Sequence, residues 1–200
     1  EDLTDIIRDN PKVCRYLDIP LQHISDSVLQ RMRRKVSRKK IESLIEHFRN
    51  KIPGVAIRTT MMTGFPGETD SDFKELKQFI TESGFDRMGV FTYSHEEGTY
   101  AGRNLNDDVP DEVKRSRAEE LMEIQRGISA GLNNKRIGEA YNVITDRREG
   151  DHFVGRTEFD SPEVDGEVYI SGDRQLHAGN FYRVKITGAD EYDRWGNFLL

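Results

Sequence analysis

A glycine-rich loop is the first part of this sequence whose residue types and spacing could do chemistry. Residues 63–69 read Thr-Gly-Phe-Pro-Gly-Glu-Thr, after an apolar segment and before a helix-prone one. Gly64 and Gly67 would let a ligand approach the backbone closely, and Glu68 could accept hydrogen bonds from a ribose hydroxyl or an amine. The same pattern is typical of a tight strand-to-helix turn capped by Thr69. These residues alone leave a ligand loop and a structural turn about equally favoured.

Two further polar positions belong to β-prone segments. Arg58 lies within the apolar segment 55–62, and a buried guanidinium needs an anionic partner. A ligand carboxylate or a structural Asp or Glu would serve, with the structural partner slightly favoured. Gln22 ends segment 15–22 and His23 follows it, where His23 could be a base or a metal ligand. A lone loop histidine is more often neither, and the same holds for His95.

Two segments concentrate charge of one sign. Residues 31–40 are strongly basic and could contact phosphates, although such a segment is more often a solvated helix face. Residues 158–167 are acidic and form either a soluble loop or a docking surface for a basic protein. From residue 135 onward, 13 acidic residues stand against 9 basic ones, the reverse of what an RNA-binding barrel usually shows.

The composition limits the class of protein. Cys14 is the one cysteine in 200 residues, so the sequence holds neither an internal disulfide nor the thiolates of an iron–sulfur cluster. We expect a reducing, cytoplasmic compartment. A net charge of -6 argues against a general nucleic-acid binder. No apolar run is long enough to span a bilayer.

The first half of the sequence predicts a parallel sheet. β-prone segments 15–22, 55–62 and 85–93 alternate with helical patterns that begin near Ser25, Ser37 and Thr69. Ligands of such folds sit at the carboxyl ends of the strands. About three βα units are visible, whereas a closed eight-unit barrel needs ~200 residues or more. We therefore expect a partial α/β barrel and a C-terminal fragment of a larger enzyme, whose missing part came first.

The second half changes pattern twice. Residues 108–138 predict a long helix, whose inner face would carry Leu121, Ile124, Ile128 and Leu132. From residue 139, short alternating segments between turn residues predict a small antiparallel β-barrel of four or five strands. The expected domains are residues 1–107, 108–138 and 139–200.

Several of these segments together resemble the radical-SAM methylthiotransferases. The similarity lies in residues 16–34, 58–60, 64–69 and 89–99, and residues 154–165 resemble the TRAM module of that family. The sequence is most similar to the branch that modifies a ribosomal protein, and the tRNA-modifying branch is the alternative. A stand-alone RNA- or protein-binding barrel with a helical arm is a third hypothesis.

The resemblance implies a radical reaction. Members use S-adenosylmethionine and two 4Fe-4S clusters to insert a methylthio group at an unactivated carbon. In the ribosomal branch this is the β-carbon of an aspartate in a small-subunit ribosomal protein. The cluster cysteines of the family have no counterpart here, so we expect these residues alone to be inactive.

The resemblance also implies roles for individual residues. Arg58 would bind the methionine carboxylate of the cofactor, while Gly64, Gly67 and Glu68 would hold its ribose or adenine, with Gln22 contributing. The acidic loop would dock the basic ribosomal protein, with the ribosome as the wider partner and nucleic acid not the main one. The residues expected to form this dock are Glu158, Asp160, Glu163 and Asp165.

Overall fold

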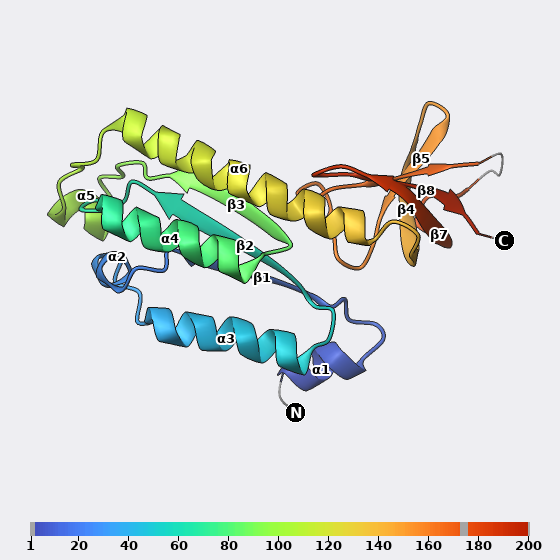
Figure 1. Cartoon of the computed structure of the whole chain (residues 1–200), viewed down its shortest axis with the longest axis horizontal. Coiled ribbons are helices and arrows are strands. Elements are labelled where there is room, and N and C mark those ends of the chain that lie inside the picture. Colours follow the sequence, from blue (N-terminus) through green and yellow to red (C-terminus); the bar gives the residue numbers. More distant parts are fainter. Residues whose placement is uncertain (1–2, 173–175, 200) are drawn as a thin grey trace.

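The computed structural model describes residues 3–172 and 176–199. An α/β unit occupies one end of the molecule and a β-barrel the other, and helix α6 (Asp111–Lys135) runs from the first toward the second (Figure 1). Within the described residues, no helix is long and apolar enough to cross a membrane.

The α/β unit is built on the parallel sheet that the sequence predicts. Its strand order is β1-β2-β3, and both pairings are parallel. Helices α1 and α5 were not predicted, because seven and five residues are too few to display a helical period. The elements are β1 (Tyr16–Gln22), β2 (Ala56–Thr63), β3 (Arg87–Thr92), α1 (Leu3–Asp9), α2 (Asp26–Arg31), α3 (Arg38–Lys51), α4 (Asp70–Ser83) and α5 (Tyr100–Asn104).

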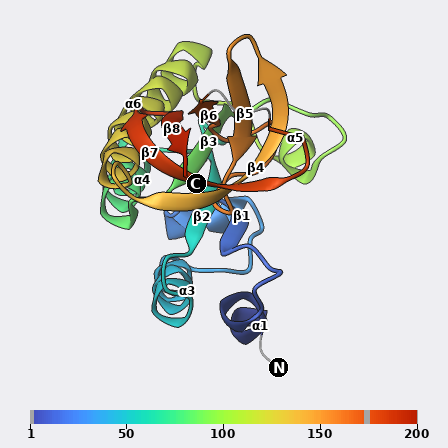
Figure 2. The ribbon, with the colours of Figure 1, turned by 90° about the vertical axis from the view of Figure 1, so that its right-hand side faces the viewer.

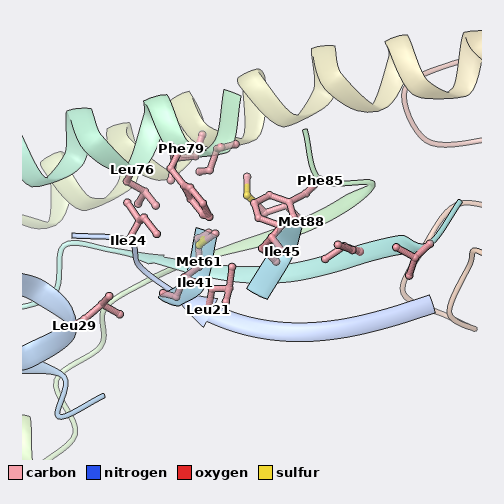
Figure 3. Close-up of a cluster of buried hydrophobic side chains, with 14 of the residues drawn as sticks. Leu21, Ile24, Leu29, Ile41, Ile45, Met61, Leu76, Phe79, Phe85 and Met88 are labelled. Carbon is pink, nitrogen blue, oxygen red and sulfur yellow. The ribbon is translucent and has the colours of Figure 1, made fainter. Parts of the chain in front are cut away.

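The main core lies between one face of this sheet and its helices. Leu21 and Met61 of the strands meet Ile45 of α3 and Leu76 of α4 there (Figure 3). Leu44 belongs to the apolar pattern that predicts α3, but it is 38% exposed, because the buried stripe of that helix passes through Ile41 and Ile45.

Alternate residues of the strands point to the other face of the sheet. Asp18 and Pro20 are exposed on β1, and Phe91 of β3 is 62% exposed. Gln22 and Met62 are half-buried on the same face. Parallel sheets are usually covered by helices on both faces. Because these residues are exposed, this face has apolar and polar groups available for contact with another part or partner.

Local signals set both ends of α4, and its start lies at Thr69 as the sequence predicts. Thr69 and Asp72 form a capping box, in which each side chain bonds the backbone N–H of the other. Gly84 ends the helix in the left-handed conformation, with φ of 54°.

Helix α6 differs from the expectation in its inner face. Leu121 is fully buried, but Ile124, Ile128 and Leu132 are only half-buried. The rest of the buried stripe is polar, because this face meets the loop after β2, the start of β3 and the β-barrel. Its members are Lys114, Arg117, Gln125, Ser129 and Asn133.

The C-terminal strands close into a barrel of order β4-β5-β6-β8-β7, which Figure 2 views from the barrel end. Four of the pairings are antiparallel, and β6 pairs with β8 in parallel. Strand β8 had no clear signal, because its inward positions hold Arg194 and Gly196 rather than apolar side chains. The strands are β4 (Ala140–Glu149), β5 (His152–Arg156), β6 (Val168–Ser171), β7 (Phe181–Ala189) and β8 (Arg194–Phe198).

Candidate functional site

The loop after β2 directs its backbone donors into the protein. The Gly64 N–H donates to Glu68 Oε2 at 2.8 Å, and the Gly67 N–H donates to Asp108 Oδ1 at 2.7 Å. The Glu68 N–H donates to the Phe65 carbonyl at 2.9 Å. These N–H groups are therefore not available to a ligand. The backbone of the loop forms a structural strand-to-helix turn, the second of the two alternatives that the sequence left open.

The two glycines are required by neighbouring side chains. Gly64 has φ of 72°, and a Cβ atom there would lie 2.1 Å from Lys114 Cγ. Gly67 has φ of 77°, and its Cβ would lie 3.1 Å from the guanidinium of Arg31. The collision with Lys114 excludes a side chain at Gly64, whereas at Gly67 the positive φ is the main constraint, because the Arg31 guanidinium would need to move only slightly. The glycines therefore pack the loop against α6 and the end of α2.

Glu68 is buried at the centre of a charged network. Arg117 Nη1 donates to Glu68 Oε1 at 2.7 Å, and Arg117 Nη2 donates to Asp70 Oδ1 at 2.6 Å. Burial raises the pKa of Glu68 above its usual value, against the opposing pull of Arg117. Sequence reasoning missed Arg117; its place one helical turn before Leu121, on the inner face of α6, is the signal that could have found it.

His23 is fully buried beside this network. Its Nδ1 accepts the Ser25 N–H at 3.0 Å, and its Nε2 lies 3.7 Å from Glu68 Oε2 without a hydrogen-bond partner among residues 3–172 and 176–199. Burial lowers the pKa of His23 to about 4, so the imidazole is neutral at pH 7. The described residues contain no group of His, Cys, Asp and Glu side chains that could hold a metal.

Asp72 ties the starts of α2 and α4 together. Its carboxylate accepts hydrogen bonds from the hydroxyls of Ser25, Ser27 and Thr69, the Ser27 bond measuring 2.6 Å. Burial by itself would raise the pKa of Asp72, but these hydrogen bonds outweigh it and hold the pKa well below its usual range. The network fixes the rim of the sheet's carboxyl end.

A cleft of about 310 Å³ opens beside this rim. Gln22 lines it and has a left-handed backbone with φ of 72°, which turns the chain sharply at the end of β1. Of the residues expected to bind cofactor, Gln22 is the one that lines this cleft. Its other walls come from Met62, Phe65, residues 31–34 and residues 99–101.

Arg58 lies toward the opposite end of the sheet and has structural partners. Its Nη1 donates to Asp165 Oδ1 at 2.7 Å, and its Nε lies 3.4 Å from Asp18 Oδ2. The Tyr16 hydroxyl donates to Asp165 Oδ2 at 2.7 Å. This corrects the assignment of Arg58 to a cofactor carboxylate, because two protein carboxylates already balance its charge.

Two of the four acidic residues expected to dock a substrate also need correction. Asp165 has a side chain only 1% exposed, and Asp160 is buried between Arg87, at 2.9 Å, and Arg194. Both carboxylates hold the barrel against the sheet and cannot reach a partner. Glu158 and Glu163 are exposed and keep that prediction.

The remaining sequence candidates lie apart from the network. His95 is exposed in the loop after β3. Cys14 is exposed and free. A 4Fe-4S cluster takes thiolates from several cysteines, so the residues of this chain do not fit such a cluster.

Comparison with known proteins follows the two halves of the fold. Residues 1–80 match the radical SAM superfamily, and residues 137–199 match the TRAM domain. The chain is 54% identical over 199 residues to the ribosomal protein uS12 methylthiotransferase RimO of Bacteroides thetaiotaomicron, covering 99% of the chain and 46% of that relative. The chain belongs to the radical-SAM methylthiotransferase family.

Other relatives agree with this family assignment. The protein of the same name from Flavobacterium johnsoniae is 52% identical, over 98% of the chain and 45% of its own length. The chain thus spans just under half the length of these methylthiotransferases. The solved structure of coproporphyrinogen III oxidase (HemN) from Escherichia coli, a radical SAM enzyme, matches with a TM-score of 0.52 and 17% identity, covering 79% of this chain and 44% of that one. That similarity confirms the partial barrel fold.

Proposed function

We propose that this chain forms part of a radical-SAM methylthiotransferase that modifies an aspartate β-carbon in the small-subunit ribosomal protein uS12. The identity of 54% across 99% of the chain to a relative named as a ribosomal protein uS12 methylthiotransferase carries the proposal, and the aspartate β-carbon is what the family resemblance implies. The open face of the sheet and the acidic barrel are consistent with it. The proposed partner is made in the cytoplasm, and we place this protein there too.

Three units would share this work. We assign residues 1–107 to the radical SAM barrel, residues 108–138 to a connecting helix and residues 139–200 to the TRAM barrel. The ion pairs Arg58–Asp165 and Arg87–Asp160 join the first unit to the third. In this proposal the TRAM barrel is held at a set position relative to the sheet.

S-adenosylmethionine would bind at the carboxyl end of the sheet. When bound and cleaved it supplies the radical that removes a substrate hydrogen atom. Gln22 offers its carboxamide at the cleft, and the buried Glu68–Arg117 pair keeps the Gly64–Gly67 turn in shape as its rim. Gly64, Gly67 and Glu68 thus act by holding the rim. The ligands of the two proposed 4Fe-4S clusters lie outside this sequence, which holds one cysteine.

The proposed substrate dock consists of Glu158 and Glu163. Both are exposed near the junction of barrel and sheet, and neither has an ion-pair partner in the part of the chain that the structure describes. A basic ribosomal protein would be attracted to these unpaired carboxylates.

Deletion of the gene in the source bacterium tests the reaction. By mass spectrometry, uS12 from ribosomes of the deletion strain should be lighter by a methylthio group minus the hydrogen atom that it replaces, and the full-length gene should restore the mass. An unchanged mass of uS12 after deletion, or a loss of methylthio groups from tRNA instead, would contradict the proposal.

Binding of purified uS12 to the full-length enzyme tests the dock. The pair Glu158→Gln and Glu163→Gln should weaken binding at low salt by about tenfold, the effect expected from two lost charge contacts. The pair Glu46→Gln and Glu119→Gln removes the same charge from exposed helix positions and should leave binding unchanged. Equal effects of both pairs would contradict a local dock.

A further inference from the structure

A basic segment, residues 31–40, runs from the end of α2 into the first turn of α3, and its residues 31–34 form one wall of the cleft. Between Asp26 and Glu42 the sequence holds no acidic residue. The segment therefore concentrates positive charge in a protein whose net charge is -6. Its basic members are Arg31, Arg33, Arg34, Lys35, Arg38, Lys39 and Lys40.

Two of these side chains are used by the fold. Arg31 donates to the Gly67 carbonyl at 2.7 Å, and its Nη2 lies 3.7 Å from Asp72 Oδ2. Arg38 pairs with Glu42 at 2.7 Å and with Glu75 at 3.3 Å.

The other five cations are not neutralised by the protein. None has a carboxylate oxygen within 4.0 Å among residues 3–172 and 176–199. Lys35, Lys39 and Lys40 are exposed, as is Arg33. A solvated helix face usually intersperses charges of both signs, whereas unpaired cations gathered on one short segment create a local field that attracts polyanions.

The segment also presents a flat aromatic contact. Arg33 has a left-handed backbone with φ of 58°, and its guanidinium lies 3.2 Å from the centroid of the Tyr100 ring. Tyr100 is 42% exposed. Exposed aromatic rings and guanidinium groups with neighbouring cations are the kind of surface on which unpaired nucleotides stack while their phosphates are neutralised.

We propose that the basic segment binds RNA, with Lys35, Lys39 and Lys40 contacting backbone phosphates and the Arg33–Tyr100 pair contacting a base. The choice of RNA over an acidic protein comes from the exposed Tyr100 ring in this pair, because a base can stack on an aromatic ring, whereas a carboxylate would use only the cations. The proposal rests on the proposed function in one respect: a ribosomal protein substrate lies among ribosomal RNA. RNA bound to this segment would then hold the cleft close to the protein substrate.

Fluorescence anisotropy with a labelled RNA hairpin carrying an unpaired loop tests the surface directly. The triple variant Lys35→Gln, Lys39→Gln, Lys40→Gln should bind about tenfold more weakly and lower the dependence of log K on log salt by about 2. The control triple Lys12→Gln, Lys51→Gln, Lys74→Gln removes the same charge from exposed positions without carboxylate partners in the described structure and should bind as the parent does.

A separate variant tests the stacked pair. Tyr100→Ala should weaken binding to the hairpin loop several-fold while leaving the salt dependence unchanged, because stacking carries no charge. Equal losses for both lysine triples, competition by polyglutamate as effective as by RNA of the same charge, or a larger effect of Arg183→Gln with Lys185→Gln on the barrel would overturn the proposal. RNA binding is measured without any methylthio transfer. A full-length enzyme that binds the RNA hairpin but does not methylthiolate uS12 would therefore contradict the proposed function and leave the RNA proposal standing.

Discussion

Arg58 on the parallel sheet and Asp165 of the β-barrel, 107 residues apart in the chain, form an ion pair of 2.7 Å between Nη1 and Oδ1. The pair is nearly closed to solvent, with side chains 15% and 1% exposed. Tyr16 completes it by donating its hydroxyl to the other carboxylate oxygen of Asp165. A residue expected to hold a cofactor and one expected to dock a substrate instead join the two halves of the molecule.

The Asp165→Asn substitution should therefore lower stability. It leaves Arg58 with only Asp18, whose side chain is 52% exposed, so we expect a loss of about 2–3 kcal/mol in the free energy of unfolding. Urea denaturation followed by circular dichroism measures it. Glu163→Gln, two residues away and exposed, should cost less than about 0.5 kcal/mol. Equal midpoints for both variants would show that the pair contributes nothing.

The Asp160→Asn substitution should be more damaging. Asp160 lies between Arg87 and the fully buried Arg194, whose Nε and Nη1 have no partner in the described part of the chain. Burial would raise the pKa of Asp160, but the two guanidinium groups outweigh it and lower the pKa. Losing that charge strands two buried cations, at a cost of about 3–5 kcal/mol.

The thermal melting temperature reports this loss, with Glu158→Gln as the exposed control. The double variant Asp160→Leu, Arg194→Met removes a charge of each sign and should recover part of the stability, because one buried cation, Arg87, is then left without a carboxylate instead of two. A double variant less stable than Asp160→Asn would argue against the electrostatic cause.

His23 predicts a pH dependence with a definite direction. Burial lowers its pKa from 6.5 to about 4, so between these values the unfolded chain binds a proton that the folded protein does not. The stabilisation is complete above pH 6.5 and is lost as the pH falls to 4. Relative to His23→Gln, the protein should lose up to about 3 kcal/mol across this range.

Urea denaturation of both proteins at intervals from pH 7.5 to 4 checks this difference. Burial raises the pKa of Glu68, so this carboxyl group changes stability in the opposite direction as the pH falls, and the comparison with the variant is needed to isolate His23. An imidazole whose NMR signals titrate near pH 6.5 would contradict its burial in neutral form.

A pair of glycine substitutions separates backbone strain from packing. Gly54→Ala places a side chain at φ of 76° with nothing within 4 Å, and should cost about 1 kcal/mol. Gly64→Ala adds a collision with Lys114 at nearly the same φ, and should cost about 3 kcal/mol. Chemical denaturation measures both. Similar costs would mean that Lys114 moves aside freely and the loop does not need its close contact with α6.

The sequence by itself determined those features whose causes lie within a few residues. Thr69 and Asp72 cap α4 because their side chains reach each other's backbone three positions away, and Gly84 ends it because glycine accepts a left-handed backbone. The spacing of the apolar residues was enough to predict the parallel strands, and the segments shared with known proteins were enough to recognise the family. Short elements such as α5, and β8 with its inward Arg194, lack such a period.

Only the tertiary structure decided which charges meet. The partner of Asp160 on β3 lies 73 residues away and that of Asp165 on β2 lies 107 away, so no local pattern could show that these carboxylates are buried rather than free. The same is true of Glu68, which pairs with Arg117. Arg117 lies on α6, a helix that begins at Asp111, 43 residues after Glu68. A charged side chain carries no sign of its partner in its own sequence neighbourhood, because ion pairing depends on which surfaces the fold brings together.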